Sequence, residues 1–138
     1  MIRFDNVWKR YPNGREALSD FTLGIERGEM VFLTGHSGAG KSTLLKLICG
    51  QNAAALPRRK IPPFRRDIGI VFQDHKLLMD RPVYDNVGLP LVIAGMPEKD
   101  ITKRVRAALD QVGLLGREKN RPIELSTGEQ QRVGIARA

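Results

Sequence analysis

The chain contains 138 residues, of which 41% are hydrophobic and 28% are charged, and 23 Lys and Arg residues against 15 Asp and Glu residues give a formal net charge of +8. This composition excludes a disordered, collagen-like or coiled-coil protein and is sufficient for one packed domain or part of one. The basic charge leaves two interpretations open: a solvated surface, or a polyanionic partner such as nucleic acid or an anionic membrane.

The N-terminal part of the sequence predicts strands and tight turns. Apolar and polar residues alternate over 2–7, which is typical of a half-buried strand, and Pro12-Asn13-Gly14 indicates a turn before a second strand at 18–25. The continuous apolar run at 30–34 predicts a strand that is covered on both faces.

The following part predicts one more strand and then helices. Residues 51–63 contain three prolines and are interpreted only as a linker. The apolar run at 68–72 predicts a strand, and the pattern then changes to a helical one. Residues 98–115 predict an amphipathic helix, whose apolar face carries Ile101, Val105, Ala108, Leu109 and Val112.

The strongest functional signal lies between the predicted strand at 30–34 and a predicted helix at 41–49. Residues 35–42 fit the pattern G-x-x-x-x-G-K-[ST] in the strand–loop–helix context that this pattern requires. Small residues let successive backbone N–H groups point at phosphate oxygens, Lys41 would reach the β- and γ-phosphates, and Ser42 would offer its hydroxyl to Mg²⁺. The predicted nucleotide site comprises Gly35, His36, Ser37, Gly38, Ala39, Gly40, Lys41, Ser42 and Thr43. A phosphate loop alone leaves kinases, GTPases, ATPases and transporter motors open.

A second anion site is predicted at the start of a C-terminal helix. Residues 125–132 contain Ser-x-x-Glu, a capping box in which Ser126 caps the first turn and Glu129 reaches back, so a helix should begin near Thr127. The N-terminus of this helix would attract an anion, and Gly128 leaves room for a phosphate to approach. The alternative interpretation is a plain helix cap.

These features together resemble the ATP-binding subunits of ABC transporters, and among them the subunits that act in bacterial cell division. The resemblance rests on the phosphate loop, on Gln73 after the predicted strand at 68–72, and on residues 125–132, which are similar to the family's signature motif. Thr127 stands where the family usually has a glycine, and Glu129 where its commonest residue is glutamine.

The resemblance implies an α/β fold, that of a P-loop NTPase of the ABC ATPase type with a helical subdomain. The nucleotide-binding core would comprise residues 1–74, the helical subdomain residues 75–124, and the signature motif with the start of its helix residues 125–138. Beside the family the chain is expected to be incomplete, either a fragment or a sequence from which segments were removed. Its sequence shows no Walker B, D-loop or H-loop segment, and the family usually has further strand-forming sequence near 51–63. We therefore expect ATP hydrolysis in the intact protein, and ATP binding without efficient turnover in these 138 residues.

The resemblance also implies roles for individual residues. Tyr11 would stack on the adenine, with a surface tyrosine at a strand end as the alternative. Lys41 and Gln73 would be the catalytic residues, and Ser42 and Gln73 would hold Mg²⁺, with a plain surface-loop glutamine as the alternative for Gln73. In a head-to-tail homodimer, the signature residues of one copy would close over the ATP in the phosphate loop of the other: Ser126, Thr127, Gly128 and Glu129.

The implied function is that of an ATP-driven motor subunit in bacterial cell division. It would act with a transmembrane partner subunit, in peripheral contact with the cytoplasmic side of the inner membrane. The N-terminal sequence lacks the apolar segment of a signal peptide, and the longest apolar run, 87–96, is too short to span a bilayer. Three alternatives remain: a related exporter or lipoprotein-release subunit, a nucleic-acid-associated ABC ATPase, and a P-loop kinase. Nucleic acid is not expected, because the sequence has no long coiled coil or zinc insertion.

Overall fold

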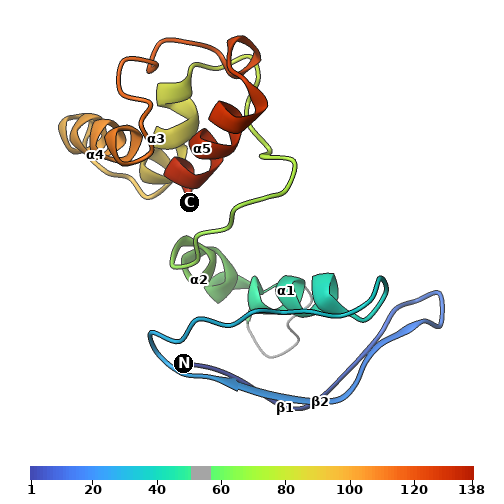
Figure 1. Cartoon of the computed structure of the whole chain (residues 1–138). Coiled ribbons are helices and arrows are strands. Elements are labelled where there is room, and N and C mark those ends of the chain that lie inside the picture. The colour runs from blue at the N-terminus through green and yellow to red at the C-terminus, as the bar shows by residue number, and fades with distance from the viewer. Residues whose placement is uncertain (51–56) are drawn as a thin grey trace. The chain divides into compact units, whose positions relative to one another are not determined.

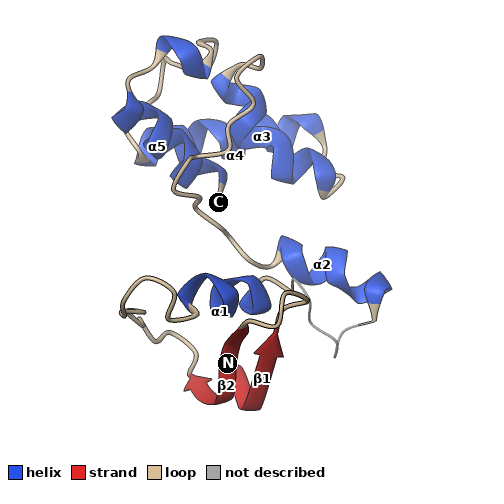
Figure 2. Ribbon diagram, turned by 90° about the vertical axis from the view of Figure 1, so that its right-hand side faces the viewer, coloured by secondary structure: helices blue, strands red, loops and turns tan. Residues whose placement is uncertain are grey.

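A computed structural model describes residues 1–50 and 57–138. The chain divides into two compact units, Met1–Arg65 and Arg66–Ala138, each with its own packing. The first unit combines a β-hairpin with a helix that follows the glycine-rich loop, and the second is built from helices (Figures 1 and 2). Among the described residues, none of the helices has the length and apolar character needed to cross a bilayer.

The sheet of the first unit is an antiparallel pair of strands, β1 (Ile2–Arg10) and β2 (Glu16–Ile25). The register pairs Ile2 with Ile25 at one end and Arg10 with Glu16 at the other. Gly14 closes the turn between the strands with φ of 80°, and its N–H donates to the carbonyl of Tyr11 at 3.0 Å. Both predicted strands and the predicted turn are confirmed, and each strand is longer than its sequence pattern indicated.

The helix expected after the glycine-rich loop is confirmed as α1 (Lys41–Ile48), which packs on β2 (Figure 2). Thr43 and Leu44 are its buried residues, and Leu18 of β2 is buried as well. The helix ends at Cys49, and Gly50 adopts the left-handed conformation, φ 68°, that commonly terminates a helix.

The two apolar runs at 30–34 and 68–72 do not form the predicted strands. Within the described residues, the only paired strands are β1 and β2. Met30 and Phe32 are 81% and 83% exposed. A buried strand needs neighbouring strands for its backbone hydrogen bonds and a layer on each face for its side chains. The two runs lie in different units and the described residues supply them with neither, so this prediction is wrong for this structure.

The linker predicted over 51–63 can be compared with the structure only from residue 57 onward, because residues 51–56 lie outside the described residues. Its later part contains a 3₁₀ turn, Arg58–Lys60, and the start of a short helix, α2 (Ile61–Arg66). The sequence did not predict α2. Proline is compatible with the first turn of a helix because the N–H groups there have no acceptor within the helix, so Pro62 and Pro63 fit this position.

The second unit packs three helices, α3 (Val83–Ile93), α4 (Glu98–Gln111) and α5 (Thr127–Arg137), around one apolar core (Figure 1). A 3₁₀ turn, Pro122–Glu124, precedes α5. The buried side chains of this core are Val83, Val87, Ile101, Val105, Leu109, Leu114, Leu125 and Val133.

The predicted amphipathic helix at 98–115 is confirmed as α4, with an earlier end. Its expected apolar face lies on the core, where Ala108 and Val112 are partly buried and the other three residues are buried. Gly113 has φ of 69°, a conformation that ends the helix, and the N–H of Leu114 donates to the carbonyl of Leu109 at 2.8 Å. Leu114 therefore returns to the core from outside the helix.

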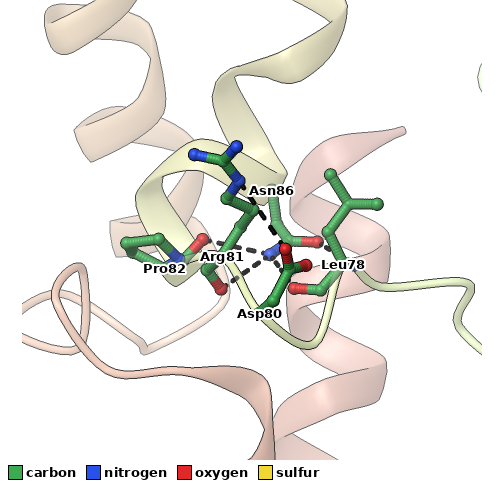
Figure 3. Close-up of polar contacts among 5 residues, drawn as sticks. All are labelled: Leu78, Asp80, Arg81, Pro82 and Asn86. Atoms are coloured by element: carbon green, nitrogen blue, oxygen red, sulfur yellow. Dashed lines mark hydrogen bonds and ion pairs between the residues drawn. The ribbon is translucent and has the colours of Figure 1, made fainter.

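The segment before α3 is held by one buried amide side chain, that of Asn86 (Figure 3). Its Oδ1 accepts from the N–H of Leu78 at 2.7 Å. Its Nδ2 lies 3.0 Å from the carbonyl oxygens of Leu78 and Pro82 and 3.3 Å from that of Arg81. One side chain thus satisfies backbone groups on both sides of the turn that leads into α3.

Candidate nucleotide-binding site

The glycine-rich loop at 35–42 has a backbone that a residue with a side chain would not easily adopt. Gly38 has φ of 88° and Gly40 has φ of 89°, both in the region that glycine tolerates best. A Cβ atom on Gly40 would lie 2.5 Å from the carbonyl oxygen of Ala17, so only glycine allows the start of α1 to approach β2 this closely. The loop is thereby fixed against the hairpin by sterics as well as by conformation.

Lys41 lies across this loop. Its Nζ donates to the carbonyl oxygens of Gly35 at 2.5 Å and of His36 at 2.8 Å. The N–H of Ala39 donates to the same carbonyl of His36 at 3.2 Å, which closes a turn inside the loop. The positive charge of Lys41 therefore lies beside the loop backbone, where a bound phosphate could exchange for the carbonyl partners.

The loop and the hairpin line an open cavity of about 540 Å³ in the first unit. Its volume is in the range of cavities that bind small molecules. The residues that line it come from the hairpin, the loop and the first turn of α1: Tyr11, Asn13, Arg15, Ala17, Ser37, Gly38, Gly40, Lys41, Ser42 and Thr43.

Tyr11, which the resemblance assigned to the nucleotide, lies at this cavity. Its hydroxyl is 3.2 Å from Oγ1 of Thr43, and Nζ of Lys9 lies 5.7 Å from the centre of its ring. The N–H of Tyr11 donates to the carbonyl of Arg15 at 2.8 Å, which fixes the turn that carries the ring. The structure thus brings an aromatic face to the same cavity as the phosphate loop, from a segment about thirty residues earlier in the chain.

Arg15 is a cavity residue that the sequence did not identify. Its Nη2 lies 3.4 Å from the carbonyl oxygen of Gly38, a long distance for a hydrogen bond, and its N–H donates to Oδ1 of Asn13 at 3.1 Å. It adds a second positive charge to the cavity beside that of Lys41. The sequence gives little indication of this role, because Arg15 belongs to no motif and simply follows the Asn13-Gly14 turn.

The remaining predicted site residues lie in the second unit. Gln73 is exposed in a turn closed by a hydrogen bond from the N–H of His75 to the carbonyl of Phe72 at 3.1 Å. The signature residues lie at the start of α5, where Thr127 and Gly128 are exposed.

The predicted capping box at the start of α5 is confirmed. The N–H of Glu129 donates to Oγ of Ser126 at 3.3 Å, and the N–H of Ser126 donates to Oε2 of Glu129 at 2.8 Å. Oγ of Ser126 also donates to Oε2 of Glu129 at 2.8 Å. Nη2 of Arg117 lies 3.9 Å from Oε1 of the same carboxylate. The hydrogen bonds from Ser126 stabilise the carboxylate, so they lower the pKa of Glu129 below its ordinary value of 4.5.

This lowered pKa gives α5 a pH-dependent cap. Because the folded pKa lies below that of the unfolded chain, Glu129 stabilises the fold fully above pH 4.5 and less as the pH falls through the lowered value. We expect Glu129→Gln to remove this part of the pH dependence, because an amide does not titrate in this range. The amide oxygen can still accept from the N–H of Ser126, so the cap itself is kept. Thermal unfolding followed by circular dichroism between pH 6 and pH 3 measures the difference. An unchanged pH profile in the variant would contradict this prediction.

The residues present fit a magnesium ion held mainly by phosphate and water. Within residues 1–50 and 57–138, no group of three or more His, Cys, Asp or Glu side chains could hold a metal ion. Mg²⁺ at nucleotide sites takes only one or two protein oxygens and completes its shell with phosphate and water. Ser42 lines the cavity beside Lys41, and its hydroxyl is an oxygen ligand of the required kind.

A family model and the most similar known sequences all indicate the same protein family. The family model described as "ABC transporter" matches residues 18–138. The "Cell division ATP-binding protein FtsE" of Escherichia coli strain K12 is 59% identical, with 100% of this chain and 68% of the relative covered. The protein of the same name in Haemophilus influenzae is 48% identical, with 100% of this chain and 70% of the relative covered. The alignment with the Escherichia coli protein has 151 positions against 138 residues here, so 13 of its positions have no counterpart in this chain.

A solved structure agrees with the sequence relatives. The dimeric structure of MJ0796, described as a bacterial ABC transporter cassette, superposes with a TM-score of 0.87 at 34% identity, and 99% of this chain and 68% of that chain are covered. A second dimeric structure of MJ0796 is bound to ADP and Pi. The chain therefore belongs to the ABC transporter family, with the fold of its ATPase cassette, a mixed α/β P-loop NTPase.

Proposed function

We propose that the protein is the ATP-binding motor subunit of a membrane complex in bacterial cell division. FtsX is the transmembrane partner in this proposal, and ATP binding and hydrolysis are coupled to remodelling of the septal cell wall. The site is on the cytoplasmic side of the inner membrane, where the subunit is peripheral. The observation that supports ATP binding is the cavity in which the phosphate loop, Lys41 and Tyr11 meet. The names of the FtsE relatives support the role in cell division.

The cavity suggests how each part of ATP would be held. Lys41 is placed to exchange its loop carbonyls for the β- and γ-phosphates, and the loop N–H groups at the start of α1 attract the same anion. Thr43, whose Oγ1 is 3.2 Å from the Tyr11 hydroxyl, would lie near the α-phosphate, and the ring of Tyr11 would stack on the adenine. Arg15 adds a second cation on the hairpin side. Ser42, which lines this cavity, would hold Mg²⁺, and the ion would supply charge neutralisation at the γ-phosphate.

We also propose that two copies form a head-to-tail homodimer with two bound ATP molecules. The exposed N-terminus of α5 presents Ser126, Thr127 and Gly128 as an anion site. This site would face the γ-phosphate in the partner's loop. The description of MJ0796 as a dimeric cassette supports this arrangement. Full turnover requires the Walker B strand and its glutamate, so for these residues alone we propose ATP binding without efficient hydrolysis.

Substitution of Ser126 separates ATP binding from dimerisation. We expect Ser126→Arg to leave the affinity for ATP unchanged and to abolish ATP-dependent dimerisation, because a long cation at the start of α5 blocks the interface. Calorimetric titration measures the affinity, and sedimentation velocity with ATP and Mg²⁺ measures the dimer. Ser126 also caps α5, and loss of such a cap destabilises a helix by about 0.5–2 kcal/mol. Thr127→Arg adds the same bulk and leaves the cap in place.

The matched control places the same charge on another exposed surface of the second unit. Gln111→Arg at the end of α4 should affect neither affinity nor dimerisation. An equal loss of ATP binding in Ser126→Arg and Thr127→Arg would contradict a site shared between two copies. A parent chain that binds no ATP would contradict the proposed function as a whole.

A further inference from the structure

Arg15 lies on the turn of the hairpin, and hydrogen bonds hold its backbone on both sides. The carbonyl group of Arg15 accepts from the N–H of Tyr11 at 2.8 Å, and the N–H of Arg15 donates to Oδ1 of Asn13 at 3.1 Å. The aromatic ring of Tyr11 and the guanidinium of Arg15 therefore belong to one closed turn. A contact that fixes the guanidinium also fixes the turn that carries the ring.

The guanidinium of Arg15 reaches the phosphate loop at Gly38. Its Nη2 lies 3.4 Å from the carbonyl oxygen of Gly38, across 23 positions of sequence. A Cβ atom on Gly38 would lie 3.0 Å from the same Nη2, which is closer than ordinary van der Waals contact. The lack of a side chain at residue 38 thus leaves room for the guanidinium beside the loop, in addition to allowing the left-handed backbone there.

Most of the hydrogen-bond donors of Arg15 have no protein acceptor. A guanidinium has five N–H donors, and the long contact to Gly38 uses one of them at most. Within residues 1–50 and 57–138, no carboxylate forms an ion pair with Arg15. The neighbouring carboxylate, that of Glu16, accepts from the hydroxyl of Ser19 instead. Because the Arg15 side chain is exposed, an anionic ligand can reach the remaining donors without a rearrangement of the fold.

The wall of the cavity beside the loop is positively charged. Its lining contains two cationic residues, Arg15 and Lys41, and no Asp or Glu. Lys41 bonds to the carbonyl groups of Gly35 and His36. Arg15 approaches the loop at Gly38, so the two charges reach the loop at different places. A ligand with several negative charges along a chain can pair with both, and a guanidinium can bond to two phosphate oxygens at once.

We propose that Arg15 binds the phosphate chain of the nucleotide from the hairpin side, so that the turn from Tyr11 to Arg15 holds base and phosphate together. This role rests on the proposed function, because ATP is taken as the ligand of the cavity. Loss of the guanidinium weakens the phosphate contact directly. It also weakens the stacking of the Tyr11 ring, because one turn carries both groups.

Substitution of Arg15 at two salt concentrations tests the phosphate contact. We expect Arg15→Met to raise the Kd for ATP with Mg²⁺ about tenfold at about 50 mM NaCl, as for a hydrogen bond to a charged group. At about 500 mM NaCl, where an exposed charge pair is screened, the difference should fall to about threefold or less. Arg15→Lys keeps the charge without the planar fork, so its Kd should lie between those of the parent chain and Arg15→Met. Calorimetric titration of the full chain measures each Kd.

A double-mutant cycle tests whether one turn holds base and phosphate together. Tyr11→Ala removes the ring and keeps the backbone bond to Arg15. We expect Tyr11→Ala combined with Arg15→Met to raise the Kd for ATP by less than the product of the two single effects, because each single variant already loosens the other contact. An effect equal to the product would show that ring and guanidinium act independently, and would overturn the joint action of the turn.

The matched control removes another exposed arginine of the same unit. Arg27→Met, in the turn after β2, should bind ATP as the parent chain does at both salt concentrations. If Arg15→Met also binds as the parent does, or if its loss of affinity is the same at both salt concentrations, the phosphate contact is overturned and the proposed ATP site stands. Equal weakening by Arg27→Met overturns it as well, since the effect is then one of general charge. A parent chain that binds no ATP overturns the proposed function, and the role of Arg15 with it.

Discussion

Replacement of Lys41 by Ala is expected to weaken ATP binding by roughly ten- to a hundredfold, which corresponds to the about 1.5–3 kcal/mol that a hydrogen bond to a charged group contributes. The Nζ atom of Lys41 now bonds to two loop carbonyls, those of Gly35 and His36, so it lies at the loop and can reach a phosphate without a large rearrangement. The variant loses both this charge and the contacts that hold the loop. Calorimetric titration with ATP and Mg²⁺ measures the loss.

The matched control for this substitution is on the same helix. Lys46 is exposed in the last turn of α1, so Lys46→Ala removes an equal charge from the same unit without touching the loop. We expect it to bind ATP as the parent chain does. Equal weakening in the two variants would mean that only the general positive charge of the unit attracts ATP. Unchanged affinity in Lys41→Ala would show that the loop at 35–42 is not the phosphate site.

The features that the sequence predicted correctly depend on residues close together in the chain. The hairpin follows from alternation and a turn with glycine, and the start of α5 follows from the Ser126 and Glu129 pair, which bonds in the predicted way. The phosphate loop is likewise contiguous, so its conformation is set by its own glycines and by the helix that it begins. In each case local sequence contains the interacting groups.

The features that the sequence predicted wrongly or missed depend on distant partners. The apolar runs at 30–34 and 68–72 have the composition of buried strands, yet a strand exists only where another strand pairs with it. Arg15 is one of many arginines in the sequence, and only its position in space distinguishes it. Tyr11 and Thr43 meet across 32 positions of sequence, and only the family resemblance suggested that both serve one site.

Asn86 is the side chain whose loss should destabilise the second unit most. It is fully buried, and Asn86→Leu would leave the N–H of Leu78 and the carbonyl group of Arg81 without their partner (Figure 3). The carbonyl groups of Leu78 and Pro82 would lose the side-chain amide and keep one backbone N–H each. An unpaired buried polar group costs about 1–3 kcal/mol, so we expect the free energy of unfolding to fall by about 3–4 kcal/mol. Since small domains have only about 5–15 kcal/mol in total, the variant should be close to unfolding at physiological temperature. Urea unfolding followed by circular dichroism of the helices measures the change.

Two further variants test whether the hydrogen bonds of Asn86, and not the loss of any amide side chain, cause this destabilisation. Gln111→Leu replaces an exposed amide on α4 and should change the free energy of unfolding by less than about 0.5 kcal/mol. Asn86→Asp keeps an oxygen that can accept from Leu78 and turns the Nδ2 donor into a second oxygen, which faces carbonyl oxygens instead of bonding to them. It should therefore be destabilising at neutral pH, and less so at low pH, where the carboxyl group regains a proton to donate. Equal stability of Asn86→Leu and Gln111→Leu would show that the turn before α3 holds without its central amide.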